Sequence, residues 1–200
     1  MTQSRNIGEA EAKDLLMELA RLRRENEDLR LRVAELTDLS DQDPLLGVLN
    51  RRAFLRELGR VQAYSKRHDL VAAIVFFDLD GLAEINNRHG HEAGDEALRC
   101  VCRTVRACVR ASDLLGRLGG DEFGLVLVGT AAADADRKMQ AICDTLSQTR
   151  VQAGLDPKGL QVSITYGVQS ILADCAPEAL IARADEQFYG RKGRNGFTQP

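Results

Sequence analysis

Aromatic residues and long apolar runs are scarce in this sequence. Aromatics make up 4% of the 200 residues, and tryptophan is absent. The longest apolar run covers residues 70–77, far short of the roughly 20 residues that a membrane-spanning helix needs. The first eleven residues are mostly polar and lack the apolar core of a secretory signal. We therefore expect a cytoplasmic protein that has no membrane partner.

A strong excess of one charge and paired cysteines are also lacking. The formal net charge is -3, which gives no electrostatic reason to expect a nucleic-acid partner. The five cysteines are an odd number without C-x-x-C spacing, so we expect reduced thiols and no zinc site. With 44% apolar and 28% charged residues, the composition is typical of a globular protein. The length allows one α/β domain and a small appendage.

Residues 11–40 follow a heptad repeat, after residues 1–10, which we expect to be flexible. The d positions hold Leu15, Leu22, Leu29 and Leu36, and the a positions hold Ala12, Leu19, Asn26 and Val33. Leucine at d with a single Asn at a is typical of a parallel two-stranded coiled coil, because paired Asn side chains satisfy each other only in register.

The charges beside this repeat also favour a parallel pair. Each residue at g would meet an opposite charge at e in the partner, the pairs being Glu18 with Arg23 and Glu25 with Arg30. We therefore expect a homodimer through the coiled coil. Four heptads are marginal alone, so the globular domains would add to the stability of the dimer. The alternative is a single amphipathic helix that packs on its own domain.

Beyond residue 40 the pattern alternates between helices and strands. Residues 41–50 contain Asp, Pro and Gly and are typical of a hinge. Apolar periodicity predicts helices near 50–67, 94–110, 132–150 and 177–190, and strands at 70–78, 113–118, 122–128 and near 160–169. Gly119 and Gly120 separate two of these strands, which is a hairpin signal. We expect an α/β domain over residues 41–196 with a mixed, largely antiparallel sheet covered by helices.

Carboxylates stand at two of the predicted strand ends. Asp78 and Asp80 follow one strand, and Asp121 and Glu122 lie at the hairpin tip. An aspartate at a strand end is most often a turn former or helix cap. Carboxylates on neighbouring strand ends, however, bind Mg²⁺ and leave positions free for phosphate, which suits phosphoryl or nucleotidyl transfer. The hairpin glycines would let a nucleobase or ribose approach the backbone.

An ordered series of sequence blocks in residues 41–196 resembles the GGDEF-domain diguanylate cyclases. The blocks are residues 43–52 (DPLLGVLNRR), residues 77–82 (FDLDGL) with Ile85-Asn86, Gly90-His91 and Gly94-Asp95, residues 117–123 (RLGGDEF), and Ala184-Asp185 with Phe188-Tyr189 and Gly193-Arg194-Asn195. The resemblance implies a palm-like, nucleotidyl-cyclase-like domain that binds one GTP. Two such domains would meet face to face and join two GTP molecules into cyclic di-GMP.

The same resemblance implies roles for individual residues. Asp78, the backbone carbonyl of Leu79 and Asp121 would hold Mg²⁺, with Mn²⁺ as a second candidate metal. Asp121 would also accept the proton, with Glu122 in support. Asn86 and Asp95 would hydrogen-bond guanine, and the backbone at Asp80, Gly81 and Leu82 would hold phosphates. The other implied substrate-binding residues are His91, Gly119, Gly120 and Lys192.

Two further features bear on regulation and activity. Arg110 and Asp113 match the R-x-x-D motif, which in relatives is an inhibitory site for cyclic di-GMP; the alternative is a helix-end arginine beside a capping aspartate. Ala83 stands where relatives often carry Lys, and Tyr189 precedes Gly193 by fewer residues than in relatives. These departures leave open a catalytically silent receptor for cyclic di-GMP or GTP. A structural dimerisation module without nucleotide would fit the coiled coil but leave the acidic residues unexplained.

Overall fold

The computed structural model describes residues 17–30, 41–152, 159–172 and 175–192, and the chain divides into two units, residues 1–40 and 41–200. In the first unit, residues 17–30 form an α-helix on which Leu19, Leu22 and Leu29 are exposed. Glu18 forms an ion pair with Arg21 of the same helix at 2.9 Å. The remaining predicted a and d residues outside this helix, Ala12, Leu15, Val33 and Leu36, lie outside the described residues. The coiled coil therefore stays a prediction.

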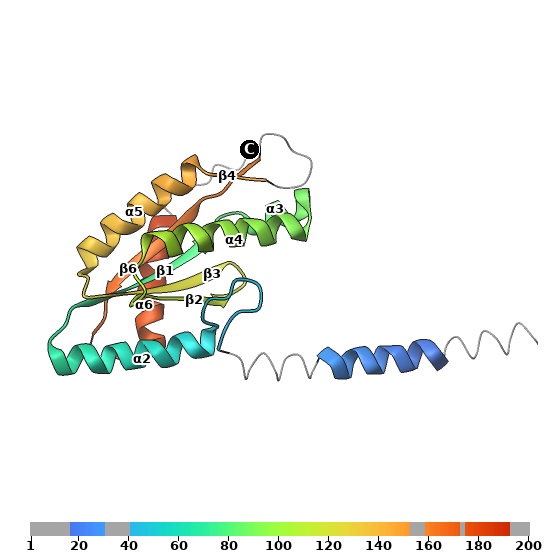
Figure 1. Cartoon of the computed structure of the whole chain (residues 1–200), viewed down its shortest axis with the longest axis horizontal. Coiled ribbons are helices and arrows are strands. Elements are labelled where there is room, and N and C mark those ends of the chain that lie inside the picture. Colours follow the sequence, from blue (N-terminus) through green and yellow to red (C-terminus); the bar gives the residue numbers. More distant parts are fainter. Residues whose placement is uncertain (1–16, 31–40, 153–158, 173–174, 193–200) are drawn as a thin grey trace, which may run out of the picture. The chain divides into compact units, whose positions relative to one another are not determined.

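The second unit contains the α/β domain (Figure 1). Its elements in chain order are α2 (Arg51–His68), β1 (Ala72–Leu79), α3 (Leu82–His89), α4 (His91–Cys108), β2 (Leu114–Gly119), β3 (Glu122–Val128), α5 (Ala132–Gln148), β4 (Arg150–Val151), β5 (Leu160–Gln161), β6 (Ile164–Ser170) and α6 (Pro177–Lys192). Throughout the described ranges, no helix is both long enough and apolar enough to cross a membrane.

A four-stranded sheet in the order β2-β3-β1-β6 forms the centre of this domain. Each neighbouring pair of strands is antiparallel, which confirms the largely antiparallel sheet that the sequence predicts. An isolated parallel bridge joins Leu49, in the 41–50 loop, to Gly116 of β2. All eight residues of β1 are buried, because β1 lies between two other strands and both of its faces are covered by helices.

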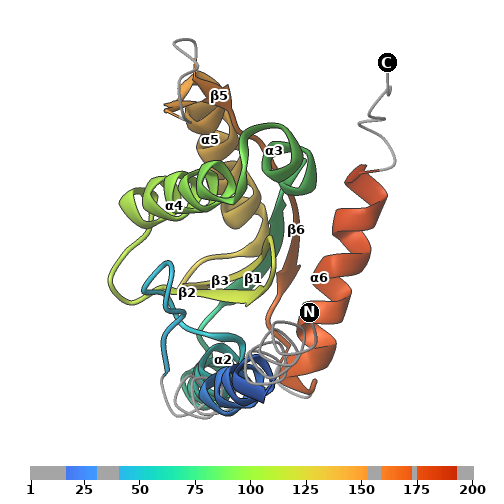
Figure 2. The ribbon, with the colours of Figure 1, turned by 90° about the vertical axis from the view of Figure 1, so that its right-hand side faces the viewer.

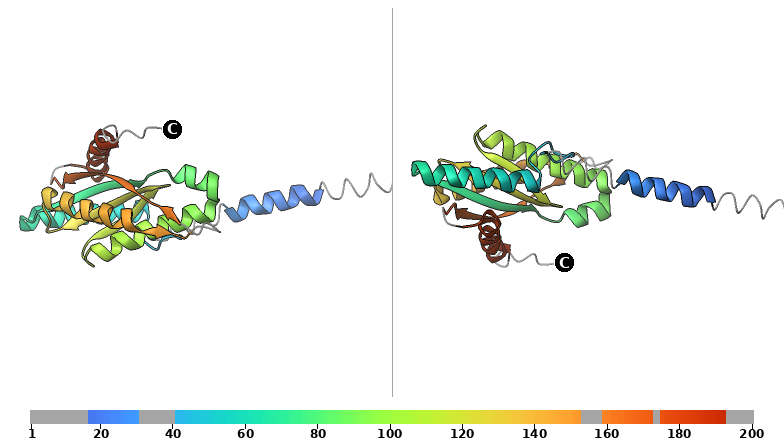
Figure 3. Two further views of the ribbon diagram at one scale, coloured as in Figure 1. Left: turned by 90° about the horizontal axis from the view of Figure 1, so that it is seen from above. Right: turned by 90° about the horizontal axis from the view of Figure 1, so that it is seen from below.

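Alternate residues of β1 face opposite layers of helices. Ala73, Val75 and Phe77 belong to an apolar cluster that includes residues of α4 and α5. Ile74 and Phe76 belong to a second cluster with residues of α2 and α6. Figures 2 and 3 show the same layers, with α4 and α5 on one side of the sheet and α6 on the other.

Three local features differ from the sequence-based expectation. The sequence predicts no helix over α3, which is only 8 residues long and packs just Leu82 and Ile85 against the core. Helix α4 begins at His91 rather than near residue 94, directly after Gly90, whose φ is 85°. The strand expected near 160–169 is two strands: β6 joins the central sheet, and β5 pairs with β4 in a separate two-stranded sheet.

The ring of Phe54 packs against two glycines of the β2–β3 hairpin. Gly116 and Gly124 are partners in the strand register. A Cβ atom on Gly124 would lie 2.5 Å from Cζ of Phe54, and one on Gly116 would lie 2.7 Å from Cδ2. Phe54 is completely buried. The missing side chains therefore let α2 lie close to the hairpin that carries Asp121.

We expect Gly124→Ala to lower the free energy of unfolding by about 1–3 kcal/mol, because the added methyl group overlaps a buried ring. Urea denaturation would measure the change. Gly59→Ala in α2 is the control, since a Cβ there meets only Pro177 at 3.7 Å and alanine favours a helix over glycine by about 1 kcal/mol. If both variants changed the free energy of unfolding by the same amount and in the same direction, the result would contradict the tight contact at Phe54.

Candidate active site

The two predicted carboxylate groups lie side by side at one edge of the central sheet. Asp78, near the end of β1, is the register partner of Glu122 at the start of β3. The backbone N–H of Leu79 donates to the carbonyl oxygen of Asp121 at 3.1 Å. The tip of the hairpin is thus joined to the end of β1, which brings Asp78, Asp121 and Glu122 into one region.

Negative charge dominates this edge. Burial raises the pKa of Glu122, and the charges of Asp121 and Asp185 raise it further, whereas Arg51 lowers it. Asp185 lies on α6, and burial likewise raises its pKa. Asp185 has no role in the sequence-based site, and only its place in the C-terminal block could have pointed to it. The crowding of carboxylates favours the binding of a cation.

The oxygen atoms at this edge fit a magnesium ion by their chemistry. Mg²⁺ prefers oxygen ligands and is usually bound through one or two carboxylates while it keeps several waters. Asp78 and Asp121 offer carboxylates, and Leu79 offers a backbone carbonyl. Within the described residues, no three His, Cys, Asp or Glu side chains are arranged to hold a metal ion. The predicted set needs only two such side chains, so it is compatible with this finding.

The side chain of Asp80 is hydrogen-bonded to Thr165 of β6 and to Ser163 just before this strand. Its two carboxylate oxygens accept hydrogen bonds from the hydroxyls of Ser163 and Thr165, each at 2.8 Å. The backbone N–H of Asp80 donates to the carbonyl of Ser163 at 3.0 Å. This N–H is therefore already engaged, and the predicted phosphate-binding backbone would rely on the residues that follow.

The residues after Asp80 begin α3 and leave N–H groups available. Gly81 is the N-cap residue, with φ of 72° and no side-chain cap. The first intrahelical hydrogen bond runs from the N–H of Ile85 to the carbonyl of Gly81. Because the first N–H groups of a helix lack such partners, Leu82 and its neighbours present amides to which an anionic group could bind.

The predicted guanine-binding residues lie on the packed helices α3 and α4. Asn86, on α3, covers Gly94 of α4, the residue directly before Asp95. The carboxylate of Asp95 lies 3.9 Å from the guanidinium of Arg99 one turn along the helix. His91 is exposed at the first position of α4. Asn86 thus contacts the residue that precedes Asp95.

Arg117 joins the hairpin turn to the 41–50 loop. Its Nε donates to the carbonyl of Gly120 at 2.8 Å, and its guanidinium forms a half-buried ion pair with Asp43 at 3.2 Å. The other carboxylate oxygen of Asp43 accepts from the N–H groups of Leu45 and Leu46. Sequence reasoning gives Arg117 no role, although it belongs to the RLGGDEF block.

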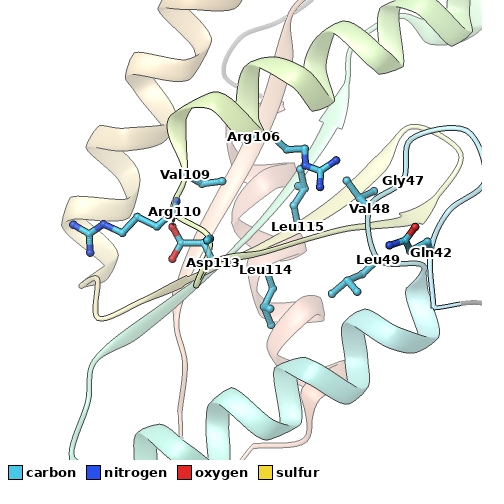
Figure 4. A pocket seen from close by; sticks show the side chains of 11 residues that line it. Gln42, Gly47, Val48, Leu49, Arg106, Val109, Arg110, Asp113, Leu114 and Leu115 are labelled. Carbon is cyan, nitrogen blue, oxygen red and sulfur yellow. Dashed lines mark hydrogen bonds between the residues drawn. The ribbon is translucent and has the colours of Figure 1, made fainter.

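The residues of the R-x-x-D motif lie beside a pocket of about 330 Å³ between the 41–50 loop and residues 106–115 (Figure 4). Asp113 accepts hydrogen bonds from the N–H groups of Arg110 at 2.9 Å and Val128 at 3.1 Å. The carboxylate of Asp113 therefore joins the turn after α4 to the end of β3 through two backbone N–H groups. Arg110 and Asp113 both line the pocket, and the guanidinium of Arg110 extends away from Asp113 in Figure 4.

Three other predicted residues stand at element ends. Gly119 is the last residue of β2, and Gly120 follows it in the turn with φ of 36°. Lys192 is the last residue of α6, and its side chain lies outside the described part of the chain. The hairpin glycines therefore adjoin Asp121, whereas the substrate contact implied for Lys192 stays a prediction.

An antiparallel sheet between two helical layers, with carboxylates at one edge, is the architecture of a palm-like nucleotidyl-cyclase domain. The family model described as "Diguanylate cyclase, GGDEF domain" matches residues 40–197. The chain belongs to this family.

Individual relatives agree with this assignment. The response regulator PleD of Caulobacter vibrioides is 35% identical over 174 residues, which are 85% of this chain and 38% of PleD. The probable diguanylate cyclase DgcC of Escherichia coli is 34% identical over 130 residues, 65% of this chain and 34% of DgcC. This chain thus spans about a third of the length of these relatives. The crystal structure of the diguanylate cyclase SiaD of Pseudomonas aeruginosa, in complex with its activator SiaC, has a TM-score of 0.72 and 30% identity, over 97% of this chain and 75% of SiaD.

We expect Arg117→Lys to lower the free energy of unfolding by about 1–2 kcal/mol, because a lysine ammonium cannot reproduce the two-sided contact of the guanidinium. Chemical denaturation would measure it. Arg60→Lys is the matched control: Arg60 is exposed and forms a surface ion pair with Glu57 on the same helix, so its replacement should change stability by less than about 0.5 kcal/mol. A loss no larger for Arg117→Lys than for the control would contradict the bridging role.

Proposed function

We propose that this chain is a diguanylate cyclase, which condenses two GTP molecules into cyclic di-GMP and releases two pyrophosphates. The observation that carries the proposal is the joining of the β1 end to the hairpin tip by the Leu79–Asp121 hydrogen bond. This contact gathers the carboxylates of Asp78, Asp121 and Glu122 next to the uncapped start of α3. Oxygen ligands for a metal and free amides for phosphate therefore occur together, as nucleotidyl transfer requires.

In the proposed reaction, the 3′-oxygen of one GTP forms a bond to the α-phosphorus of the other, and the bond from that phosphorus to pyrophosphate breaks. Asp121 accepts the proton of the 3′-hydroxyl. Asp78, Asp121 and the carbonyl of Leu79 would hold the metal. Mg²⁺, when bound, neutralises charge on the triphosphate and lowers the pKa of the attacking hydroxyl. Asn86 and Asp95 orient the guanine, and the α3 amides orient the phosphates.

A homodimer is part of this proposal. Each domain binds one GTP, so a single domain would lack the second reactant. Leu19, Leu22 and Leu29 are exposed on the helix of residues 17–30, and a partner helix in a parallel coiled coil would cover them. The dimer would therefore hold two half-sites at a high effective concentration.

A second candidate function is a receptor that binds cyclic di-GMP or GTP without turnover. Ala83, on the first turn of α3, supplies no cation where relatives often have Lys. Arg51 provides positive charge that acts on Glu122, and its guanidinium donates to the carbonyl of Leu118 at 3.3 Å. We favour the active cyclase, because the carboxylates at the sheet edge are all present.

Incubation of the purified protein with GTP and Mg²⁺, followed by chromatography, would test the activity. Cyclic di-GMP and pyrophosphate are the expected products. Binding of cyclic di-GMP by a folded dimer that forms no product would favour the receptor instead.

We expect Asp121→Ala to reduce turnover by at least about a hundredfold, since it removes a metal ligand and the proton acceptor. The thermal midpoint should change little, because the hydrogen bond that joins Asp121 to Leu79 uses the backbone carbonyl. Asp144→Ala, which removes an exposed carboxylate on α5, is the control and should keep the parent rate. Parental turnover in Asp121→Ala would contradict its assigned role.

Product inhibition at Arg110 predicts a second kinetic result. We expect Arg110→Ala to keep the initial rate and to abolish the slowing caused by added cyclic di-GMP. The fold should persist, because Arg110 donates to Asp113 through its backbone N–H. Replacing Asp113 would be less informative, since its carboxylate also accepts from Val128. Arg67→Ala, at the end of α2, is the control; equal inhibition of the parent, control and Arg110→Ala proteins would refute the inhibitory site.

A further inference from the structure

The amide of Asn86 is held in one orientation by the surface of α4. Its Oδ1 atom is buried and has no hydrogen-bond partner in the described part of the chain. A Cβ atom placed on Gly94 would overlap this oxygen. In glycine a hydrogen occupies the Cβ direction, so the α-hydrogen of Gly94 points at Oδ1 and offers it a weak C–H···O contact.

Because Oδ1 faces α4, the NH₂ group of Asn86 lies on the other side of the amide. Nδ2 is bonded to the same amide carbon as Oδ1 and lies on its opposite side, so it points away from Gly94, and Asn86 itself is half-buried. The amide therefore presents its NH₂ group outward and keeps its acceptor inward. A group that contacts Asn86 from outside α3 and α4 meets a hydrogen-bond donor.

We propose that Gly94 is a specificity-determining positioning residue, which turns the NH₂ group of Asn86 toward the 6-oxo group of guanine. The inference rests on the proposed function, since it assumes that a guanine nucleotide binds beside Asn86. Guanine carries an acceptor at position 6 and donors at N1 and N2. The NH₂ group of Asn86 donates to the acceptor at position 6. The carboxylate of Asp95, one residue beyond Gly94, accepts from the donors at N1 and N2.

The arrangement discriminates against adenine. Adenine carries an amino group at position 6, which would face the NH₂ group of Asn86, and its unprotonated N1 would face the carboxylate of Asp95. Both contacts would leave buried polar groups unpaired, a costly outcome for a binding site. Without the space at Gly94, the Asn86 side chain would have to leave α4, and its amide would lose this fixed orientation.

A double-mutant cycle on Asn86 and Gly94 tests the inference. Gly94→Ala and Asn86→Ala should each weaken binding of the guanine nucleotide by about ten- to a hundredfold, the effect of losing one oriented hydrogen bond. Gly94→Ala/Asn86→Ala should bind about as weakly as Asn86→Ala alone, because no amide remains for the added methyl group to displace, and its other close neighbour, Cδ1 of Leu82 at 3.0 Å, is the end of a flexible side chain. Asn87→Ala, an exposed neighbour on α3, should bind like the parent.

The probe is 3′-deoxyguanosine triphosphate with Mg²⁺, measured by calorimetry. It lacks the attacking hydroxyl, so binding is measured without product formation. A parent protein that binds this probe but makes no cyclic di-GMP from GTP would sink the proposed activity and leave the role of Gly94 testable. The inference would be overturned by a double variant whose loss of affinity is the product of the two single losses. Unchanged affinity in Gly94→Ala would also overturn it. A parent protein that binds no guanine nucleotide would also overturn the inference.

The adenine counterpart, 3′-deoxyadenosine triphosphate, measures selectivity. The parent should prefer the guanine probe, and Gly94→Ala should lose about ten- to a hundredfold of that preference. A merely structural effect of the methyl group would weaken both nucleotides equally. Thermal unfolding of each variant would identify loss of fold. Should Gly94→Ala unfold, Asn86→Ser, which keeps Gly94 and removes the amide, should show the same loss of guanine preference; retained preference would again overturn the inference.

Discussion

The register between β1 and β3 is the constraint on which the rest of the structure depends. Phe77 pairs with Phe123, and Asp78 pairs with Glu122. The two phenylalanine rings stack on one face of the sheet, with their centroids 5.0 Å apart. A slip of one residue would turn every apolar side chain of β1 to the opposite face of the sheet. Since both faces are buried against helices, many core contacts enforce the pairing that sets the two acidic residues opposite each other.

The core thus determines the site geometry, although the site residues contribute little to the core. Burial raises the pKa of Glu122 and of Asp185, so their charged forms are disfavoured here. Such crowding is tolerated because strand pairing and helix packing hold the elements that carry these residues. The carboxylates lie at the sheet edge, where solvent, a metal ion or a substrate can compensate their charge.

Sequence patterns predict most of this architecture, because apolar periods and turn residues act locally. The strand before Asp78, the glycine hairpin and the long helices all carry such signals. Helix α3 has only 8 residues, and its one apolar pair on the core, Leu82 and Ile85, is too short a pattern to predict a helix. The role of Arg117 is hidden for another reason: its partner Asp43 lies 74 positions away in the sequence. Contacts of this kind become visible only when the chain is folded.

The site also shows why a sequence motif underdetermines its own chemistry. The sequence places Asn86 and Asp95 in blocks typical of guanine binding, yet an Asn side chain can present either its oxygen or its nitrogen. The packing of α3 on α4 removes this ambiguity, because the space left at Gly94 admits Oδ1 and so leaves the nitrogen outward. If a guanine nucleotide binds here, Gly94, on the helix that follows Asn86, would contribute to its recognition without touching the base. Specificity would then depend on helix packing as much as on the identity of the side chains that face the ligand.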